Sequence, residues 1–151
     1  MDVPDLRHAA RVLLVDGAGR VLLFRGHDPG RPDAGSWWFT VGGGVDEGES
    51  HREAAARELF EETGLAVEPD SLSGPLHREY AEFTIAGVDY RQDNEFYAAR
   101  IDSHEVDTVG FTDLETELVL EHRWWSPADL RATKDTVYPT CLPDLVDRLG
   151  A

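Results

Sequence analysis

Cysteine is almost absent from this chain of 151 residues: Cys141 is the only one, so no intrachain disulfide is possible. A reducing compartment, which we take to be the cytoplasm, is therefore expected. No run approaches the roughly 18 apolar residues of a membrane-spanning helix, and the first residues form no apolar segment, so we expect neither a membrane span nor a signal peptide. No repeat, linker or low-complexity segment interrupts the chain, which predicts a single domain over residues 1–151.

Basic residues are few compared with acidic ones. The sequence has 14 lysines and arginines against 30 aspartates and glutamates, which gives a formal net charge of −16. This balance argues against binding to duplex nucleic acid, which requires a basic surface. A phosphorylated small molecule is still a suitable partner if metal ions offset the repulsion between its charges and those of the protein. With 41% hydrophobic and 29% charged residues, the composition is typical of a globular protein with a sizeable core.

Short apolar runs between glycine and proline turns predict most of the secondary structure. Strands are expected at residues 7–16 and 20–27, forming a hairpin, at 37–39, at 76–86 and 88–101, forming a second hairpin, and at 118–126. Helices are expected at residues 50–63, from 126 onward and at 139–149, with loops at 28–36 and 102–117. This order predicts an α/β fold with a mixed central β-sheet between helices.

The segment between Ser50 and Gly64 carries the clearest helix signals. Ser50 is a suitable N-cap and Glu53 completes a capping box with it, while Gly64 is placed to end the helix in the left-handed conformation. Four residues at helical spacing form one stripe, which we expect to be buried. They are Ala56, Leu59, Phe60 and Thr63.

Three glutamates, Glu58, Glu61 and Glu62, form another stripe of the same helix. Like charges at this spacing destabilise a helix by about 0.2–0.5 kcal/mol per pair. Divalent cations give a reason to keep them, since Mg²⁺ and Mn²⁺ prefer oxygen ligands and Mg²⁺ commonly binds one or two carboxylates together with substrate phosphates. The alternative is a solvated acidic face. Under either interpretation Arg57 is spaced to pair with Glu53 and Glu61.

Between Gly43 and Leu65, a glycine is followed at fixed intervals by glutamates, an arginine, aliphatic residues and a second glycine. The residues at these positions are Gly43, Glu49, Arg57, Glu58, Leu59, Glu61, Glu62, Gly64 and Leu65. This pattern resembles a Nudix box, the mark of hydrolases that act on nucleoside diphosphates linked to another moiety. Two departures, Val41 in place of a frequent proline and Asp46 in place of a more common glutamate, lie outside the defining positions.

The resemblance implies a Nudix-type α/β/α sandwich and a metal site that holds Mg²⁺ or Mn²⁺. The implied metal ligands are Glu58, Glu61, Glu62 and the carbonyl oxygen of Gly42. Arg57 would support the site by orienting a glutamate. The general base would be Glu58 or a glutamate from a loop. Glu58 cannot easily be both ligand and base, since a carboxylate shared with a metal is a weak base.

Further residues are candidates for the site by their position relative to the box. In this family another ligand or base often comes from the segment before the last strand, where Glu117 and Glu121 are candidates against the alternative of solvated charges. Arg25 is a candidate for a substrate phosphate, or else a surface arginine. Trp38 is a candidate for stacking on a base, and Tyr80 for contacting a dinucleoside polyphosphate, with core or strand packing as the alternative for each.

The implied reaction is hydrolysis of a diphosphate bond in a small nucleotide substrate. Oxidised dNTPs, ADP-ribose or nucleotide sugars, and dinucleoside polyphosphates all remain open as substrates. The alternative from another functional class is a catalytically weak regulatory Nudix module that binds a nucleotide without turnover. Many relatives in the family form homodimers, so a homodimer is expected only on that general ground.

Overall fold

The structure is a computed structural model that describes residues 5–85 and 87–150. The strands of this part of the chain are β1 (Leu6–Val15), β2 (Val21–His27), β3 (Ser36–Gly44), β4 (Ser73–Ile85), β5 (Val88–Arg100), β6 (Val119–Trp125) and β7 (Thr136–Val137). The α-helices are α1 (His51–Thr63), α2 (Asp113–Leu118), α3 (Pro127–Ala132) and α4 (Leu142–Gly150), with single turns of 3-10 helix at Pro32–Ala34 and Pro69–Ser71. No helix in the described part of the chain combines the length and the apolar composition that a membrane span requires.

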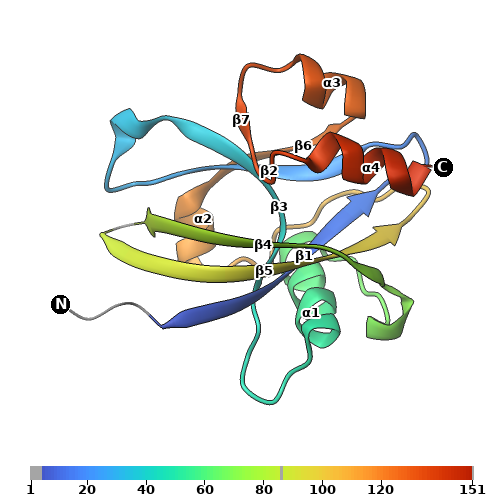
Figure 1. Cartoon of the computed structure of the whole chain (residues 1–151), viewed down its shortest axis with the longest axis horizontal. Helices are drawn as coiled ribbons and strands as arrows, with labels where there is room; N and C mark the ends of the chain where they lie inside the picture. The colour runs from blue at the N-terminus through green and yellow to red at the C-terminus, as the bar shows by residue number, and fades with distance from the viewer. Residues whose placement is uncertain (1–4, 86, 151) are drawn as a thin grey trace.

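The described strands form one mixed sheet in the order β4-β5-β1-β2-β3-β7, with β6 paired to β2 (Figure 1). The β1–β5 and β3–β7 pairs are parallel, and the other pairs are antiparallel. Strand β1 also pairs with β3, from Ala9 opposite Gly44 to Val12 opposite Val41. This pairing places the glycine-rich end of β3, which precedes α1 in the sequence, against the middle of β1.

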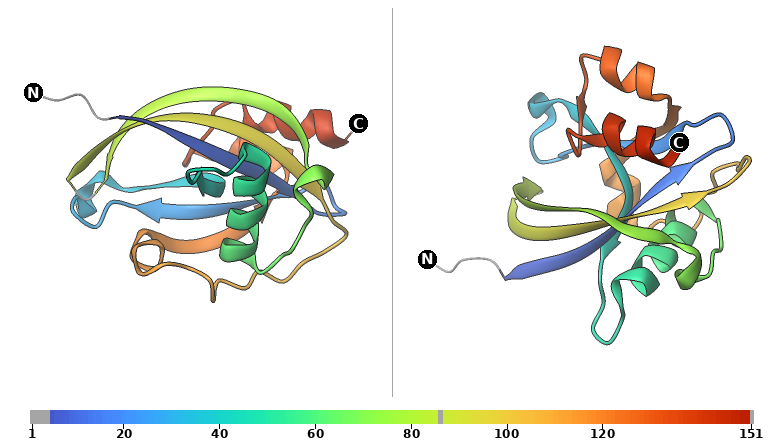
Figure 2. Two further views of the ribbon diagram at one scale, coloured as in Figure 1. Left: turned by 90° about the horizontal axis from the view of Figure 1, so that it is seen from below. Right: turned by 45° about the vertical axis from the view of Figure 1, so that its right-hand side comes forward.

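Two hydrophobic cores cover the two faces of the sheet. The first contains Ala55 and Leu59 of α1 packed on Leu22 and Phe24 of β2. The second contains α3 and α4 packed on alternate residues of the same strands, including Leu23. Figure 2 shows the resulting layers, with α1 on one side of the sheet and α3 and α4 on the other. The predicted α/β sandwich with a mixed sheet is therefore confirmed.

The second predicted hairpin is confirmed, since β4 and β5 pair antiparallel from His77 opposite Phe96 to Ile85 opposite Val88, while Ala86 lies outside the described residues. The first is confirmed only at its turn, since β1 and β2 pair antiparallel there and Val15 opposite Val21 is the one pair in register among the described residues. The physical reason is that β1 already uses its hydrogen-bonding edges for β5 and β3, so β2 diverges and pairs with β3 and β6 instead.

The acidic segment predicted to be a loop contains a helix that the sequence reasoning missed. Thr112 caps α2 by accepting a hydrogen bond from the backbone N–H of Glu115 at 3.2 Å. The Glu115 carboxylate accepts one from the N–H of Thr112 at 3.0 Å, which completes a capping box. The short strand β7 was also missed, because two residues carry no periodicity.

The orientation of α1 differs from the prediction at one position. Ala56, Leu59 and Thr63 are buried as expected, but Phe60 is 56% exposed. The inward-facing residues instead follow the spacing Ala55, Leu59, Glu62. Successive helical residues are about 100° apart, so a helix that turns Glu62 toward the sheet must turn Phe60 toward solvent. The buried face of α1 therefore includes Glu62 in place of Phe60.

Candidate active site

Local signals at both ends of α1 fix the helix that carries the glutamates. The Ser50 hydroxyl accepts the N–H of Glu53 at 3.1 Å, and the Glu53 carboxylate accepts the N–H of Ser50 at 3.0 Å. Gly64 ends the helix in the left-handed conformation, with φ of 77°. Both features match the sequence prediction. An N-cap of this kind contributes about 0.5–2 kcal/mol, so the position of the glutamates along the helix is set locally.

Glu62 lies at the centre of the site. Its side chain is almost fully buried, with 5% of the residue exposed, and its carboxylate accepts the N–H of Gly42 at 2.9 Å. Burial raises the pKa of Glu62 well above its ordinary value, since a charged carboxylate loses hydration there. Gly42 has φ of 145°, a conformation that side-chain-bearing residues rarely adopt. The N–H of Gly42 therefore donates a hydrogen bond within the site, while metal binding by the carbonyl oxygen of Gly42 stays a prediction.

Arg57 organises the acidic groups next to Glu62. Its guanidinium donates to Glu49 at 2.8 Å, to Glu58 at 3.0 Å and to the carbonyl oxygen of Gly44 at 2.9 Å. The hydrogen bond from Arg57 lowers the pKa of Glu49 and raises that of Arg57 itself. Of its two predicted partners, Glu61 is within 3.4 Å. Glu53 serves as a cap instead. These contacts suit a residue that orients glutamates.

A third carboxylate reaches the site from outside the box. Oxygens of Glu58, Glu62 and Glu115 lie within 4.8 Å of one another. Burial raises the pKa of Glu58. The carboxyl of Glu115 is hydrogen-bonded to that of Glu62, which raises the pKa of Glu62 further. Three partly or fully buried carboxylates that converge on one point repel one another when ionised. A divalent cation with oxygen ligands removes that repulsion, so these residues fit Mg²⁺ or Mn²⁺.

Glu61 and the two glutamates predicted near the last strand lie outside this trio. Glu61 has a side chain that is 36% exposed and contacts Arg57. Glu117 is exposed, and its carbonyl oxygen contacts the ring of His27 at 2.9 Å. Glu121 forms an ion pair with Arg25 at 2.9 Å. The choice of Glu117 or Glu121 as the further acidic residue is therefore not supported by the geometry, because α2 turns Glu115 toward α1 instead.

The predicted substrate contacts are not brought together either. Arg25 alternates with Phe24 along β2, so it lies on the sheet face of the second core, opposite α1, paired with Glu121. Trp38 is 3% exposed and makes an edge contact with Trp125 at 5.0 Å between ring centroids. A buried ring in the second core has no free face for a base, so the stacking prediction for Trp38 is not supported.

Tyr80 is exposed on β4, and its hydroxyl donates to Glu82 at 2.8 Å. That hydrogen bond to a carboxylate raises the pKa of the phenol. The contact is local to one strand, two residues apart, and involves no residue of the acidic trio. A role for Tyr80 with a dinucleoside substrate stays a prediction.

Sequence reasoning missed one cation beside the trio. Arg11 of β1 donates to the hydroxyl of Thr40 at 3.3 Å and also to the Thr40 carbonyl oxygen. Burial lowers its pKa, while the negative charges of Glu62 and Glu58 raise it. The sequence does contain a signal for this residue: Arg11 is the only charged residue in the apolar run of residues 9–15. Arginine is rarely buried without a partner, so its presence there indicates a buried polar contact. Arg11 thus places a buried positive charge near Glu62 and Glu58.

Replacing Gly43 with alanine is expected to weaken metal binding and to lower metal-dependent turnover while the fold persists. A Cβ at Gly43 would lie 2.5 Å from Oε1 of Glu58, so the carboxylate must move away from the other two. Only the end of a flexible side chain is displaced, which explains why folding should survive. Thermal denaturation with and without Mg²⁺ measures the change as a smaller metal-induced rise in Tm.

Gly44→Ala is the matched control for this substitution. A Cβ there would meet the guanidinium of Arg7 at 2.8 Å and would leave the three carboxylates untouched. Its metal-induced rise in Tm should match that of the unaltered protein. Equal behaviour of the two alanine variants would contradict the position assigned to Glu58.

Comparisons with known proteins agree with this geometry. A family model for the NUDIX domain matches residues 5–145. An RNA pyrophosphohydrolase of Dinoroseobacter shibae is 47% identical over 62 residues, which make up 41% of this chain and 36% of that protein. An uncharacterized Nudix hydrolase of Yersinia pestis is 39% identical over 85 residues, 52% of this chain and 44% of that one. The match therefore spans less than half the length of these curated relatives.

Solved structures share the fold across nearly the whole chain. The MutT protein from Methanosarcina mazei Go1 superposes with a TM-score of 0.67 at 21% identity, covering 99% of this chain and 96% of that one. The E. coli dihydroneopterin triphosphate pyrophosphohydrolase gives a TM-score of 0.63 at 23% identity, covering 99% and 100%. Fold and site together define an α/β domain with a carboxylate cluster suited to a divalent cation. The chain belongs to the NUDIX domain family.

Proposed function

We propose that the protein is a metal-dependent pyrophosphohydrolase that cleaves a diphosphate bond in a small nucleotide derivative. The observation that carries this proposal is the convergence of Glu58, Glu62 and Glu115 within 4.8 Å at the end of the glycine-rich strand β3. The complete box, the family match and relatives named as RNA pyrophosphohydrolases support it. The net charge of −16 favours a compact phosphorylated substrate over a long polyanion.

Glu58 and Glu62 would hold Mg²⁺ or Mn²⁺, which when bound offsets phosphate charge and makes a water molecule easier to deprotonate. Glu62 is prepared for this role because the N–H of Gly42 fixes its carboxylate at 2.9 Å. Glu58 is fixed from the other side by Arg57 at 3.0 Å. Held in place before substrate arrives, these groups need little rearrangement during the reaction.

The proton of the attacking water has two candidate acceptors in the site. Arg57 donates to Glu58 and occupies one of its oxygens, which leaves Glu58 better placed to hold the cation than to accept a proton. Glu115 has no ion pair with Arg57, and its carboxylate is held by the N–H of Thr112. Glu115 is therefore the better general base of the two, with Glu58 and Glu62 as the ligands. Arg57 acts as a positioning residue, and Arg11 adds positive charge beside the developing negative charge.

The test is a substrate panel assayed for phosphate and nucleotide release with Mg²⁺, with Mn²⁺ and with chelator. It contains dNTPs, oxidised dNTPs, ADP-ribose, nucleotide sugars, diadenosine polyphosphates and a short RNA with a 5′-triphosphate. We expect turnover of at least one small nucleotide that stops when chelator is added. The RNA arm is included because of the names of the relatives, and the charge argument predicts that it reacts more slowly.

Two outcomes would change the proposal. Turnover that persists in chelator would overturn the metal-dependent mechanism. Nucleotide binding without any turnover across the panel, measured by calorimetry with Mg²⁺ present, would favour a regulatory Nudix module instead.

A further inference from the structure

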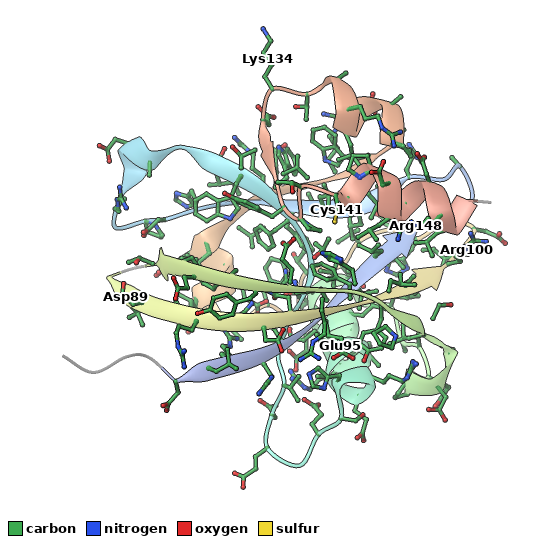
Figure 3. All side chains as sticks on the ribbon, in the orientation of Figure 1. Asp89, Glu95, Arg100, Lys134, Cys141 and Arg148 are labelled. Atoms are coloured by element: carbon green, nitrogen blue, oxygen red, sulfur yellow. The ribbon has the colours of Figure 1, made fainter. Side chains whose placement is uncertain are left out.

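A second group of metal-ligating side chains lies on the other face of the sheet, away from α1. His77 and Glu79 are on β4, and Cys141 precedes α4, beside which it is labelled in Figure 3. One ligand atom from each of the three lies within 4.8 Å of the others. None of them belongs to the box or contacts Arg57. Cys141 is more than sixty residues away from the β4 pair in the sequence, so only the fold brings the three side chains together.

The contacts within this group converge on one atom. Nε2 of His77 lies 3.5 Å from Sγ of Cys141 and 3.4 Å from an oxygen of Glu79. A ring nitrogen carries either one hydrogen or one lone pair, so the two partners would have to share it. In a relay of cysteine, histidine and carboxylate, the carboxylate would contact the other ring nitrogen, Nδ1. The arrangement therefore does not match a nucleophilic triad.

Two of the three separations match those of ligands around one tetrahedral metal ion, and the third, between Sγ of Cys141 and the carboxylate of Glu79, is within 4.8 Å. With Zn–S of about 2.3 Å, Zn–N and Zn–O of about 2.0–2.1 Å and tetrahedral angles, S and N would be about 3.5 Å apart and N and O about 3.4 Å apart. The observed distances are 3.5 Å and 3.4 Å. The side chains of His77 and Glu79 are 28% and 37% exposed, so an ion can reach them from solvent.

We propose that His77, Glu79 and Cys141 form a Zn²⁺ site with its fourth position open to water. The chemistry of the donors separates this site from the acidic trio, because thiolate and imidazole favour Zn²⁺ whereas carboxylates alone favour Mg²⁺ or Mn²⁺. A bound ion links β4 to the turn before α4, and this link stabilises the position of α4 over the second core. Zn²⁺ thereby stabilises the folded chain independently of the reaction at α1.

The test uses the whole purified protein after treatment with chelator, and its probes are Co²⁺ and Zn²⁺ alone. Co²⁺ is expected to give the near-ultraviolet absorption of a thiolate-to-cobalt charge transfer, and one equivalent of Zn²⁺ should abolish it. Zn²⁺ is also expected to slow the reaction of Cys141 with Ellman's reagent by at least about tenfold, since a coordinated thiolate is less available. Excess Mg²⁺ should give no such protection.

Three variants make the test specific. His77→Asn keeps the thiol for the readout but should weaken Zn²⁺ binding by more than about 100-fold, because even outer-shell partners of a metal account for about 10- to 100-fold. Glu79→Gln, at a more exposed side chain, checks the same point if His77→Asn fails to fold. Glu62→Gln is the control at the other site and should keep the full cobalt absorption and thiol protection.

The outcome distinguishes a metal site from a plain hydrogen-bonded cluster. Absence of the cobalt absorption together with unprotected Cys141 would overturn the proposal. Protection that is as strong in both His77→Asn and Glu79→Gln as in the unaltered protein would also overturn it, since Cys141 alone would then bind the ion. Because every readout concerns Cys141, the result does not depend on whether the protein hydrolyses any nucleotide.

Discussion

Replacing Glu62 with glutamine is expected to lower metal-dependent turnover by about 10²- to 10³-fold or more, the scale of losing one fixed electrostatic contact in an active site. The amide oxygen of glutamine still accepts the N–H of Gly42, which lies 2.9 Å from the present carboxylate, so the geometry is kept. What is lost is the negative charge that binds the cation. Steady-state kinetics on the best substrate of the panel, at saturating Mg²⁺, measure the effect.

The same variant separates loss of function from loss of fold. Removing one of three converging carboxylates relieves repulsion in the metal-free protein, so its Tm should be equal to or above that of the unaltered protein. The rise in Tm on adding Mg²⁺ should shrink, because bound ligand stabilises only through its affinity for the folded state. Near-normal turnover with a normal metal-induced rise would rule out Glu62 as a ligand.

Glu115→Gln is expected to lower turnover by about 10²- to 10⁴-fold, the usual range for removal of a general base. The carboxylate of Glu115 lies within 4.8 Å of those of Glu58 and Glu62. Glutamine keeps an oxygen to accept the N–H of Thr112, so α2 should remain capped. The measurement is the pair of values kcat and KM, and a base should affect kcat more than KM.

Glu117→Gln is the matched control, two residues further along the same short helix. Its side chain is exposed and has no contact with the acidic trio, so turnover should stay within about twofold of the unaltered protein, as for most surface substitutions. A large loss in Glu117→Gln with little change in Glu115→Gln would reverse the roles assigned to the two glutamates. Similar losses in both would indicate an effect on α2 as a whole.

The sheet keeps the two proposed metal sites apart. The carboxylate trio lies on the face covered by α1, and the His77, Glu79 and Cys141 group lies on the face covered by α4. Substitutions at one site should therefore leave the other intact, since distant and independent sites usually behave additively. This separation allows each proposal to be tested with variants of the other as controls.

The sequence by itself determined the features that depend on neighbours along the chain. The capping box of Ser50 and Glu53, the left-handed Gly64 and the spacing of the box residues are all visible within one helix and its approach. The β4–β5 hairpin and the start of a helix at residue 126 were also predictable, because a turn or a helix start is formed by a few consecutive residues. These signals were enough to predict the α/β class and the acidic helix.

Only the tertiary structure decided which acidic groups meet and which way they face. Periodicity alone placed Phe60 in the core, whereas the structure buries Glu62, which accepts the N–H of Gly42, and exposes Phe60. Glu115 and Arg11 join the site from segments on either side of the box, and no local pattern links them to α1. The physical reason is that hydrogen bonds and charges act through space, so partners distant in the chain are chosen by the pairing of β1 with β3 and by the packing of α2.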